Sequence, residues 1–272
     1  MTRTLRLLQD TEGSIFMTDI KKAFENGKAF IPFVTAGDPD LETTEKLLIA
    51  MSENGADIIE IGIPFSDPIA EGVVIQEADL RSLAAGTTTD KIFDMVKRIR
   101  PQVKCALALM TYMNPVFAYG TEKFMSKCKD SGISGVIIPD TPYEEKDELT
   151  PYADKYGIDV ISLIAPTSND RIKMIAKESQ GFVYCVSSLG VTGVRSEITT
   201  NISDMVKLVR TVSDTPCAIG FGISTPEQAK EMAQYADGVI VGSAIVKIVE
   251  QYGKNSVEPV CEYVRKMKEA IM

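Results

Sequence analysis

The sequence contains no histidine and no tryptophan among its 272 residues, and it has no stretch of eighteen consecutive apolar residues. Without histidine, neither a Ser-His-Asp triad nor a Cys-His pair can carry catalysis. Proton transfer would fall to carboxylates, tyrosine or lysine. Because a membrane-spanning helix needs about twenty apolar residues, none is predicted.

The five cysteines are an odd number, and no two of them form a CxxC motif. Together with the missing histidine, this argues against a disulfide framework and against a zinc site, so no metal is expected. Cys105, Cys185 and Cys217 lie in apolar runs, where we expect them as small core residues. Free thiols of this kind fit a reducing, cytoplasmic location.

Basic residues are outnumbered: 29 Lys and Arg stand against 38 Asp and Glu, which gives a net charge of −9 and a pI near 4.8. No run of Lys or Arg stands out, so nucleic-acid binding is not indicated. An anionic ligand would have to be held by local backbone groups.

The first residues, MTRTLRLLQDTEGSIF, lack the long apolar segment of a signal peptide. Met17 opens MTDIKKAF, which looks like a natural start and a short helix. We therefore expect residues 1–16 to be a disordered extension and residues 17–272 to form one domain.

Short apolar runs alternate with segments of helical spacing along the rest of the chain. Most runs are continuously apolar, which is typical of parallel strands covered on both faces. The runs are AFIPFVTAG (29–37), DIIEIGIP (57–64), KCALALMTY (104–112), GVIIPD (135–140), DVISLIAP (159–166), GFVYCVSS (181–188), CAIGFGIS (217–224) and DGVIVGSA (237–244).

The segments between these runs carry helix signals. Residues 41–55 place Leu41, Leu47, Leu48 and Met51 on one stripe and end at a glycine. Thr225 followed by Pro226 reads as a helix start. Eight strands in strict alternation with helices predict a (β/α)8 TIM barrel with an extra N-terminal helix. An open doubly wound sheet is the alternative, although no GxGxxG follows the first strand.

Two carboxylates in the segment 57–72 are the first candidates for chemistry. Glu60 lies inside an apolar run, and burial there would raise its pKa, so that it could give and take a proton near neutral pH. A paired structural carboxylate is the other interpretation. Glu71, in the loop that follows, would by itself be expected to be exposed, but beside Glu60 it becomes a second acid–base candidate. Asp67, in Ser-Asp-Pro, is better explained as a loop-fixing residue.

Glycine-rich stretches occupy the last three strand-to-helix loops, LGVTGV (189–194), GFGIST (220–225) and VGSAIVKIVE (241–250). Each alone is a tight turn, but together they indicate a phosphate site, because barrels frequently bind phosphate at helix N-termini between their last loops. The candidate phosphate-binding residues are Gly193, Gly222, Gly242 and Ser243.

Six ordered motifs resemble the tryptophan synthase α chain family from about residue 17 to 250. They are IPFVTAGDPD, IEIGIPFSDPIAEG, LMTYMNPVFAYG, GVTG, GFGISTPEQA and GSAIVKIVE. The resemblance implies a lyase of tryptophan biosynthesis, which cleaves indole-3-glycerol phosphate by retro-aldol chemistry into indole and glyceraldehyde 3-phosphate. It implies no cofactor in this chain and pyridoxal phosphate in a β chain partner.

The resemblance also assigns roles to individual residues. Glu60 matches the general acid–base that protonates indole C3, and Glu71 stands where the family usually has an aspartate that interacts with the indole N–H. Tyr184 joins them as a catalytic candidate. Residues matching substrate-lining positions are Phe33, Tyr112, Ile137, Thr192, Phe221 and Ile223.

The same resemblance implies an allosteric αββα heterotetramer, in which Asp67 and Asp140 lie on surfaces that meet the β chain. The chain departs from the family pattern at Glu71, which is one methylene longer than aspartate, and at Val73, where proline is common. A misplacement of about 1 Å can cost roughly a hundredfold in rate, so a catalytically weak α chain, kept as a regulatory partner of the β chain, is the alternative. Other phosphate-binding barrels, such as a sugar-phosphate isomerase or indole-glycerol-phosphate synthase, leave the Glu60 and Glu71 unit unexplained.

Overall fold

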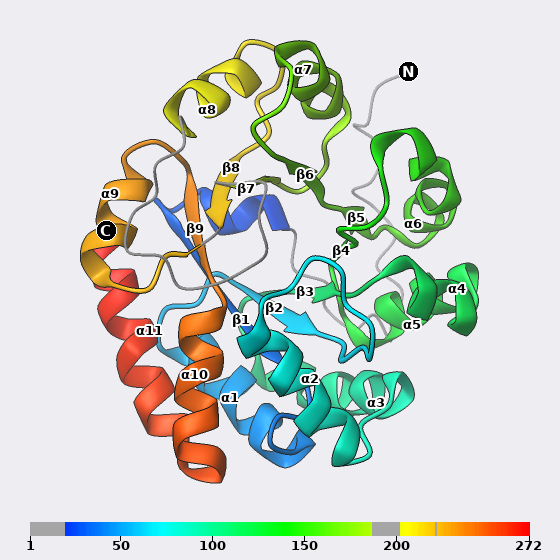
Figure 1. Ribbon diagram of the computed structural model, residues 1–272, viewed down its shortest axis with the longest axis vertical. Helices are drawn as coiled ribbons and strands as arrows, with labels where there is room; N and C mark the ends of the chain where they lie inside the picture. The colour runs from blue at the N-terminus through cyan, green and yellow to red at the C-terminus, as the bar shows by residue number, and fades with distance from the viewer. Residues whose placement is uncertain (1–19, 187–201, 221) are drawn as a thin grey trace.

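The computed structural model describes residues 20–186, 202–220 and 222–272. Over these residues the strands form a ring of parallel neighbours with helices around it (Figure 1). The strands are β1 (Ala29–Thr35), β2 (Ile58–Gly62), β3 (Ala106–Met110), β4 (Gly135–Ile137), β5 (Asp159–Val160), β6 (Ser162–Ile164), β7 (Val183–Val186), β8 (Cys217–Gly220) and β9 (Gly238–Val241). The predicted (β/α)8 TIM barrel is confirmed, and the extension at 1–16 lies outside the described residues.

The strand order β5-β4-β3-β2-β1-β9-β8-β7-β6 brings the two ends of the sheet to one segment of chain. The predicted strand 159–166 is split there: β5 pairs with β4 and β6 pairs with β7. Ile161, between the two halves, points into the barrel close to Gly181, where a side-chain carbon would lie only 2.7 Å from Ile161 Cδ1. Nine labelled strands thus correspond to the eight predicted apolar runs.

Helices follow the strands as the alternation predicts. The α-helices are α1 (Leu41–Glu53), α2 (Val73–Ala84), α3 (Thr89–Ile99), α4 (Met113–Tyr119), α5 (Thr121–Ser131), α6 (Thr150–Tyr156), α7 (Asn169–Glu178), α8 (Ile202–Arg210), α9 (Pro226–Ala233), α10 (Ser243–Tyr252) and α11 (Val257–Ile271). The 3-10 helices are η1 (Ile20–Phe24), η2 (Arg100–Gln102), η3 (Tyr143–Glu148) and η4 (Gly253–Asn255). The extra N-terminal helix is therefore, within the described residues, the short 3-10 helix η1.

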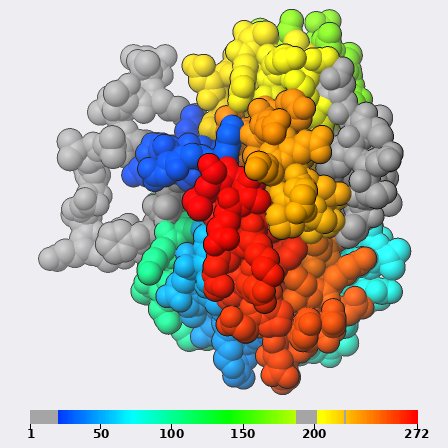
Figure 2. Space-filling view, turned by 90° about the vertical axis from the view of Figure 1, so that its left-hand side faces the viewer, coloured from blue at the N-terminus to red at the C-terminus, as the bar shows by residue number. Residues whose placement is uncertain are grey.

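Local sequence signals explain how several helices begin and end. Thr225 caps α9 in a capping box with Gln228, as the Thr-Pro pair predicted. The apolar stripe of α1 is buried at Leu47, Leu48 and Met51, and Gly55 after its end has a positive φ of 112°. The last helix, α11, packs against α1, α9 and α10 and covers one side of the barrel (Figure 2).

The core has two main layers because successive strand residues point to opposite faces. One layer lies between the strands and the helices, with Ile59 and Ile61 of β2 as examples. The other fills the barrel interior and includes Ile58 of β2 and Tyr184 of β7. Alternation therefore places Glu60, next but one to Ile58, on the interior face.

Candidate active site

Glu60 is a buried carboxyl on the interior face of β2. It is 1% exposed and lies in register with Phe33 of β1 and Ala108 of β3. Its Oε1 accepts no hydrogen bond from the described residues. Burial raises the pKa of Glu60 to about 8, because the charged form loses its hydration without gaining a partner. Near neutral pH the group is therefore protonated but close enough to its pKa to exchange the proton.

Tyr184 of β7 lies on the same interior face of the barrel and is buried. Burial raises the pKa of its hydroxyl well above the usual value, and the charge of Glu60 raises it further. The structure thus brings these two predicted catalytic residues within electrostatic reach. Tyr184 stays neutral at ordinary pH and can act only through its hydroxyl hydrogen bond or its ring.

Glu71 is buried and not exposed as a loop acid alone would be. It lies before Gly72, the residue at the N-cap of α2, and is 6% exposed. Its carboxyl is within hydrogen-bonding reach of Asp79 and Tyr112. Burial raises its pKa, and the hydrogen bonds to those two neighbours offset part of the rise. The second predicted acid therefore also sits in a low-dielectric environment.

Asp79 is a buried acid that the sequence reasoning missed. It lies on α2 and is 3% exposed, and the N–H of Phe65 donates to its Oδ2 at 3.4 Å. A sequence signal existed, because Asp79 lies on the same helical stripe as Ile75, Ala78 and Ser82, all of which are buried. An acid on the apolar stripe of a helix next to a candidate site is a sign of function.

Tyr112 joins the loops after β2 and β3. Its hydroxyl accepts a hydrogen bond from the N–H of Ala70 at 3.1 Å, and its ring lies 5.6 Å from that of Phe65. Burial and the nearby Glu71 raise its pKa, so its hydroxyl remains a neutral donor toward Glu71. The carboxylate of Asp140 accepts a hydrogen bond from the N–H of Met113, the residue after Tyr112, at 2.9 Å.

The predicted phosphate residues that the structure describes lie where strands β8 and β9 end. Gly242 is the N-cap of α10 and Ser243 its first residue, and no side chain caps that helix. The N–H groups of a first helical turn have no partner within the helix and favour an anion. Gly222 follows β8 with a positive φ of 75°. Gly193 lies outside the described residues, so the third side of the site is not described.

The remaining predicted residues fall into three groups. Phe33 and Ile137 are buried on the interior side of β1 and β4, and Phe33 lies against Gly62 and Gly242. Ile223 is buried in the outer layer of the core, between strands and helices, and so is not grouped with the interior residues. Thr192 and Phe221 lie outside the described residues.

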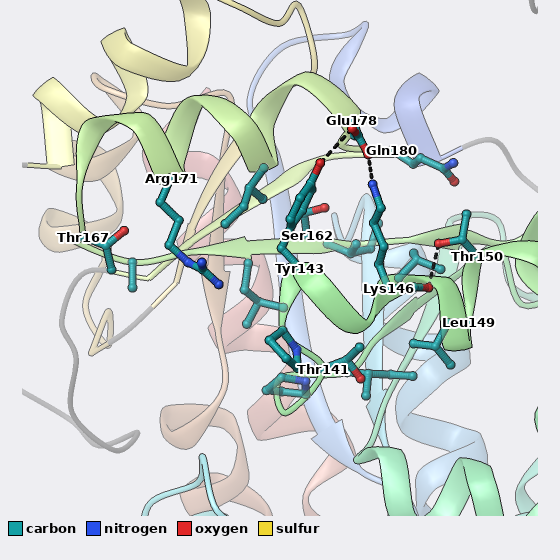
Figure 3. Close-up of a pocket in the computed structure, with 18 residues that line it drawn as sticks. Thr141, Tyr143, Lys146, Leu149, Thr150, Ser162, Thr167, Arg171, Glu178 and Gln180 are labelled. Carbon is teal, nitrogen blue, oxygen red and sulfur yellow. Dashed lines mark hydrogen bonds and ion pairs between the residues drawn. The ribbon is translucent and has the colours of Figure 1, made fainter.

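A cavity of about 440 Å³ opens elsewhere, between η3, α6 and α7 (Figure 3). None of the predicted site residues lines it. Its basic residues already have acidic partners, since Arg171 binds Glu144 through two nitrogens at 2.7 and 3.0 Å and Lys146 pairs with Glu178. This cavity therefore offers no unpaired cation to an anionic substrate.

Metal and membrane features were searched over the described ranges. No cluster of three or more His, Cys, Asp or Glu side chains with the geometry of a metal site occurs there. The five cysteines are buried and free. No helix in those ranges has the length and apolar character needed to cross a bilayer.

Comparison with known proteins decides the family. A sequence model of the tryptophan synthase alpha chain family matches residues 19–272. The chain belongs to the tryptophan synthase alpha chain family. It is 47% identical over 257 residues to the tryptophan synthase alpha chain of Lacticaseibacillus casei, covering 94% of this chain and 97% of that protein. The alpha chain of Geobacter sulfurreducens is also 47% identical, over 90% of this chain and 93% of that protein.

Solved structures of the same family agree. The tryptophan synthase alpha chain of Legionella pneumophila superposes with a TM-score of 0.83 at 34% identity, covering 94% of this chain and 98% of that one. A chain of Mycobacterium tuberculosis tryptophan synthase gives a TM-score of 0.85 at 31% identity over 94% and 99%. The predicted family, lyase class and role in tryptophan biosynthesis are confirmed. The family's reaction is the cleavage of indole-3-glycerol phosphate, the first half-reaction of tryptophan synthase.

Proposed function

We propose that Glu60 and Glu71 together carry the acid–base chemistry of indole-3-glycerol phosphate cleavage in this chain. The observation that supports it most is the interior carboxyl of Glu60, which is buried and has an Oε1 with no partner among the described residues. Such a group is expensive to keep in a fold unless it serves chemistry. Tyr184 beside it supports the same site.

In the first proposed step, protonated Glu60 gives its proton to indole C3 while the Glu71 carboxylate draws off the indole N–H proton. Glu60, now a carboxylate, takes the proton of the hydroxyl on the side-chain carbon bonded to C3. The bond between that carbon and C3 breaks, the carbon becomes the aldehyde of glyceraldehyde 3-phosphate, and the electron pair returns to the ring as Glu71 gives the proton back to nitrogen.

The substrate would lie across the mouth of the barrel. Its phosphate would bind the N–H groups of Gly242 and Ser243 at the start of α10, with Gly222 and Gly193 as further contacts. Its indole ring would contact the apolar residues of the interior face. The proposed lining residues are Phe33, Tyr112, Ile137, Thr192 and Phe221, while Ile223 packs in the outer layer of the core and is not proposed to touch the ring.

The test is indole release from indole-3-glycerol phosphate by the isosteric variant Glu60→Gln. We expect a loss of about 10²–10⁴-fold in kcat, since this is the usual contribution of a general acid–base group. Glu42→Gln, a change at an exposed carboxyl of α1, is the matched control and should leave the rate unchanged. A Glu60→Gln rate within a few-fold of the unchanged chain would overturn the proposal.

A β chain partner is part of the proposal, with pyridoxal phosphate held by that partner and none by this chain. Four apolar side chains are strongly exposed on the loops and helices after β2 and β3: Ile69 at 73%, Val73 at 66%, Leu80 at 60% and Phe117 at 72%. Exposed apolar groups of this kind mark protein interaction surfaces. They belong to the two segments that also carry Glu71 and Tyr112, so a partner bound here would sense the site and support allosteric αββα assembly.

Mixing experiments with a β chain test this surface. We expect Ile69→Asp and Phe117→Asp to weaken co-elution of the two chains, while Tyr252→Asp at the far end of α10 leaves it intact. Indole release measured with and without β chain also tests the regulatory alternative, which requires no indole in either case. The five buried, free cysteines support a cytoplasmic location within the same proposal.

A further inference from the structure

Asp79 is a buried acid for which the cleavage chemistry above has no use. It lies on the inward stripe of α2, is 3% exposed, and accepts a hydrogen bond from the N–H of Phe65 at 3.4 Å. Its other neighbour is the Thr35 hydroxyl at the end of β1. Its stripe neighbours Ile75, Ala78 and Ser82 are uncharged, so Asp79 is the one ionisable group on the buried stripe of α2.

The carboxyl groups of Asp79 and Glu71 lie within hydrogen-bonding reach of each other. Within the described part of the chain, no lysine or arginine lies against either group. Arg81, two residues along α2, is engaged by Asp38 at 2.8 and 2.9 Å and by Glu250 at 3.3 Å. The pair is therefore buried without a compensating cation.

Two carboxylates in buried contact repel each other, so such a pair retains one proton where isolated acids have lost theirs. Burial raises the pKa of both groups, and the charge of Glu71 helps raise that of Asp79 to about 8. Hydrogen-bond donors lie near both acids, since the Tyr112 hydroxyl lies near Glu71 and the Phe65 N–H and the Thr35 hydroxyl lie near Asp79. The one proton is therefore shared between the two carboxyl groups.

We propose that Asp79 is a positioning residue, which shares one proton with Glu71 at neutral pH and holds the Glu71 carboxyl through the hydrogen bond between the two groups. The proposal rests on the role of Glu71 given above and explains how the longer glutamate is held. Glu71 Oε2 accepts no hydrogen bond from the described residues although it is buried. This oxygen therefore has acceptor capacity left, which an indole N–H could use.

The groups that face this pair come from three places in the chain. Thr35 comes from β1, the N–H of Phe65 from the loop after β2 and the Tyr112 hydroxyl from the start of α4. Tyr112 stays neutral, because its own pKa is raised by burial and by both acids. Around neutral pH, the pair and Glu60 are the acids of the site that exchange protons.

The experiment compares Asp79→Asn and Asp79→Leu with the unchanged chain. The amide of asparagine still donates to Glu71, so Asp79→Asn should cleave indole-3-glycerol phosphate within about threefold of the unchanged rate at neutral pH. Leucine has a similar size but no donor, and Asp79→Leu should lose about tenfold to a hundredfold in kcat. At alkaline pH, where Asp79 ionises, Asp79→Asn should decline less than the unchanged chain. Equal activity of the two variants, or identical pH profiles for Asp79→Asn and the unchanged chain, would overturn the proposal.

Infrared spectroscopy tests the shared proton without turnover, and it does not need Asp79→Leu to fold. At neutral pH the carbonyl band of protonated carboxyl groups should lose part of its intensity in Asp79→Asn and a separate part in Glu60→Gln. An unchanged band in Asp79→Asn would overturn the proposal that Asp79 shares a proton with Glu71. It would leave the proposed role of Glu71 in cleavage standing. If Glu71→Gln cleaved substrate at the full rate while the Asp79 band was present, the role of Glu71 would fail instead.

Discussion

Tyr184 occupies the space that a side chain at position 220 would need. A methyl group on Gly220 of β8 would lie 2.5 Å from Tyr184 Oη and 2.6 Å from Cε1, both far closer than non-bonded atoms approach. The two residues lie on neighbouring strands, since Tyr184 pairs with Ala218 in the β7–β8 register. The glycine therefore leaves the space that the tyrosine ring occupies.

We expect Gly220→Ala to displace the Tyr184 ring, to cost about 1–3 kcal/mol of stability and to lower the rate of indole release. Combining it with Tyr184→Ala removes the clash, so the double variant should be less destabilised than the sum of the two changes. Urea unfolding of the single and double variants measures this coupling. Strict additivity would contradict the steric explanation.

Glu60 should make the protein less stable as the pH rises. Its pKa is about 8 in the folded state against an ordinary value of 4.5, so between these values the folded state binds more protons than the unfolded state. Stability then falls with rising pH, by about 1.4 kcal/mol per pH unit for one group. Glu60→Gln lacks this dependence. Its free energy of unfolding should therefore rise relative to that of the unchanged chain between pH 5 and pH 8.

Urea unfolding of both proteins at several pH values checks this difference. Asp79 contributes in the same direction in both proteins and cancels in the comparison. Glu42→Gln is the control, because its carboxyl is exposed and its pKa is lowered by Lys46. Parallel stability curves for Glu60→Gln and the unchanged chain would show that Glu60 is not buried with a raised pKa.

The start of α10 offers a test of phosphate binding that is separate from the acids. Ser243→Asp places a carboxylate at the first helical residue, where it stabilises the helix dipole but repels a phosphate. We expect the KM for indole-3-glycerol phosphate to rise about tenfold or more, with thermal stability unchanged or slightly higher. Ser243→Asn introduces a neutral side chain of the same size as aspartate, and it should raise KM much less. Equal KM values would place the phosphate elsewhere.

Val73 should accept the proline that the family often has there. It is the first residue of α2, and Gly72 before it has a ψ of 167°, which suits a residue that precedes proline. Val73→Pro should therefore stabilise the chain by about 0.4–1 kcal/mol through the unfolded state. Thermal unfolding checks the sign. Val74→Pro, one position later, should give a smaller gain or a loss.

Much of the fold was predictable because its signals are local. The apolar runs predicted the positions of all the described strands, and Thr225 with Pro226 predicted the start of α9. The split at Ile161 was not predictable, because it depends on which strands the two halves meet across the closed barrel. Glu60 was identified from its apolar neighbours, which locate an acid on a buried strand without any knowledge of its partners.

The sequence by itself determined the barrel, the interior position of Glu60 and the family, since periodicity and ordered motifs are properties of the chain alone. Only the tertiary structure decided that Glu71 is buried and that Asp79 lies against it. Both features depend on how the loop after β2 meets Tyr112, whose hydroxyl accepts from the N–H of Ala70, because these groups come from separate segments of the chain. The charge of a buried acid is set by such neighbours, and neighbours across space are not readable from spacing along the chain.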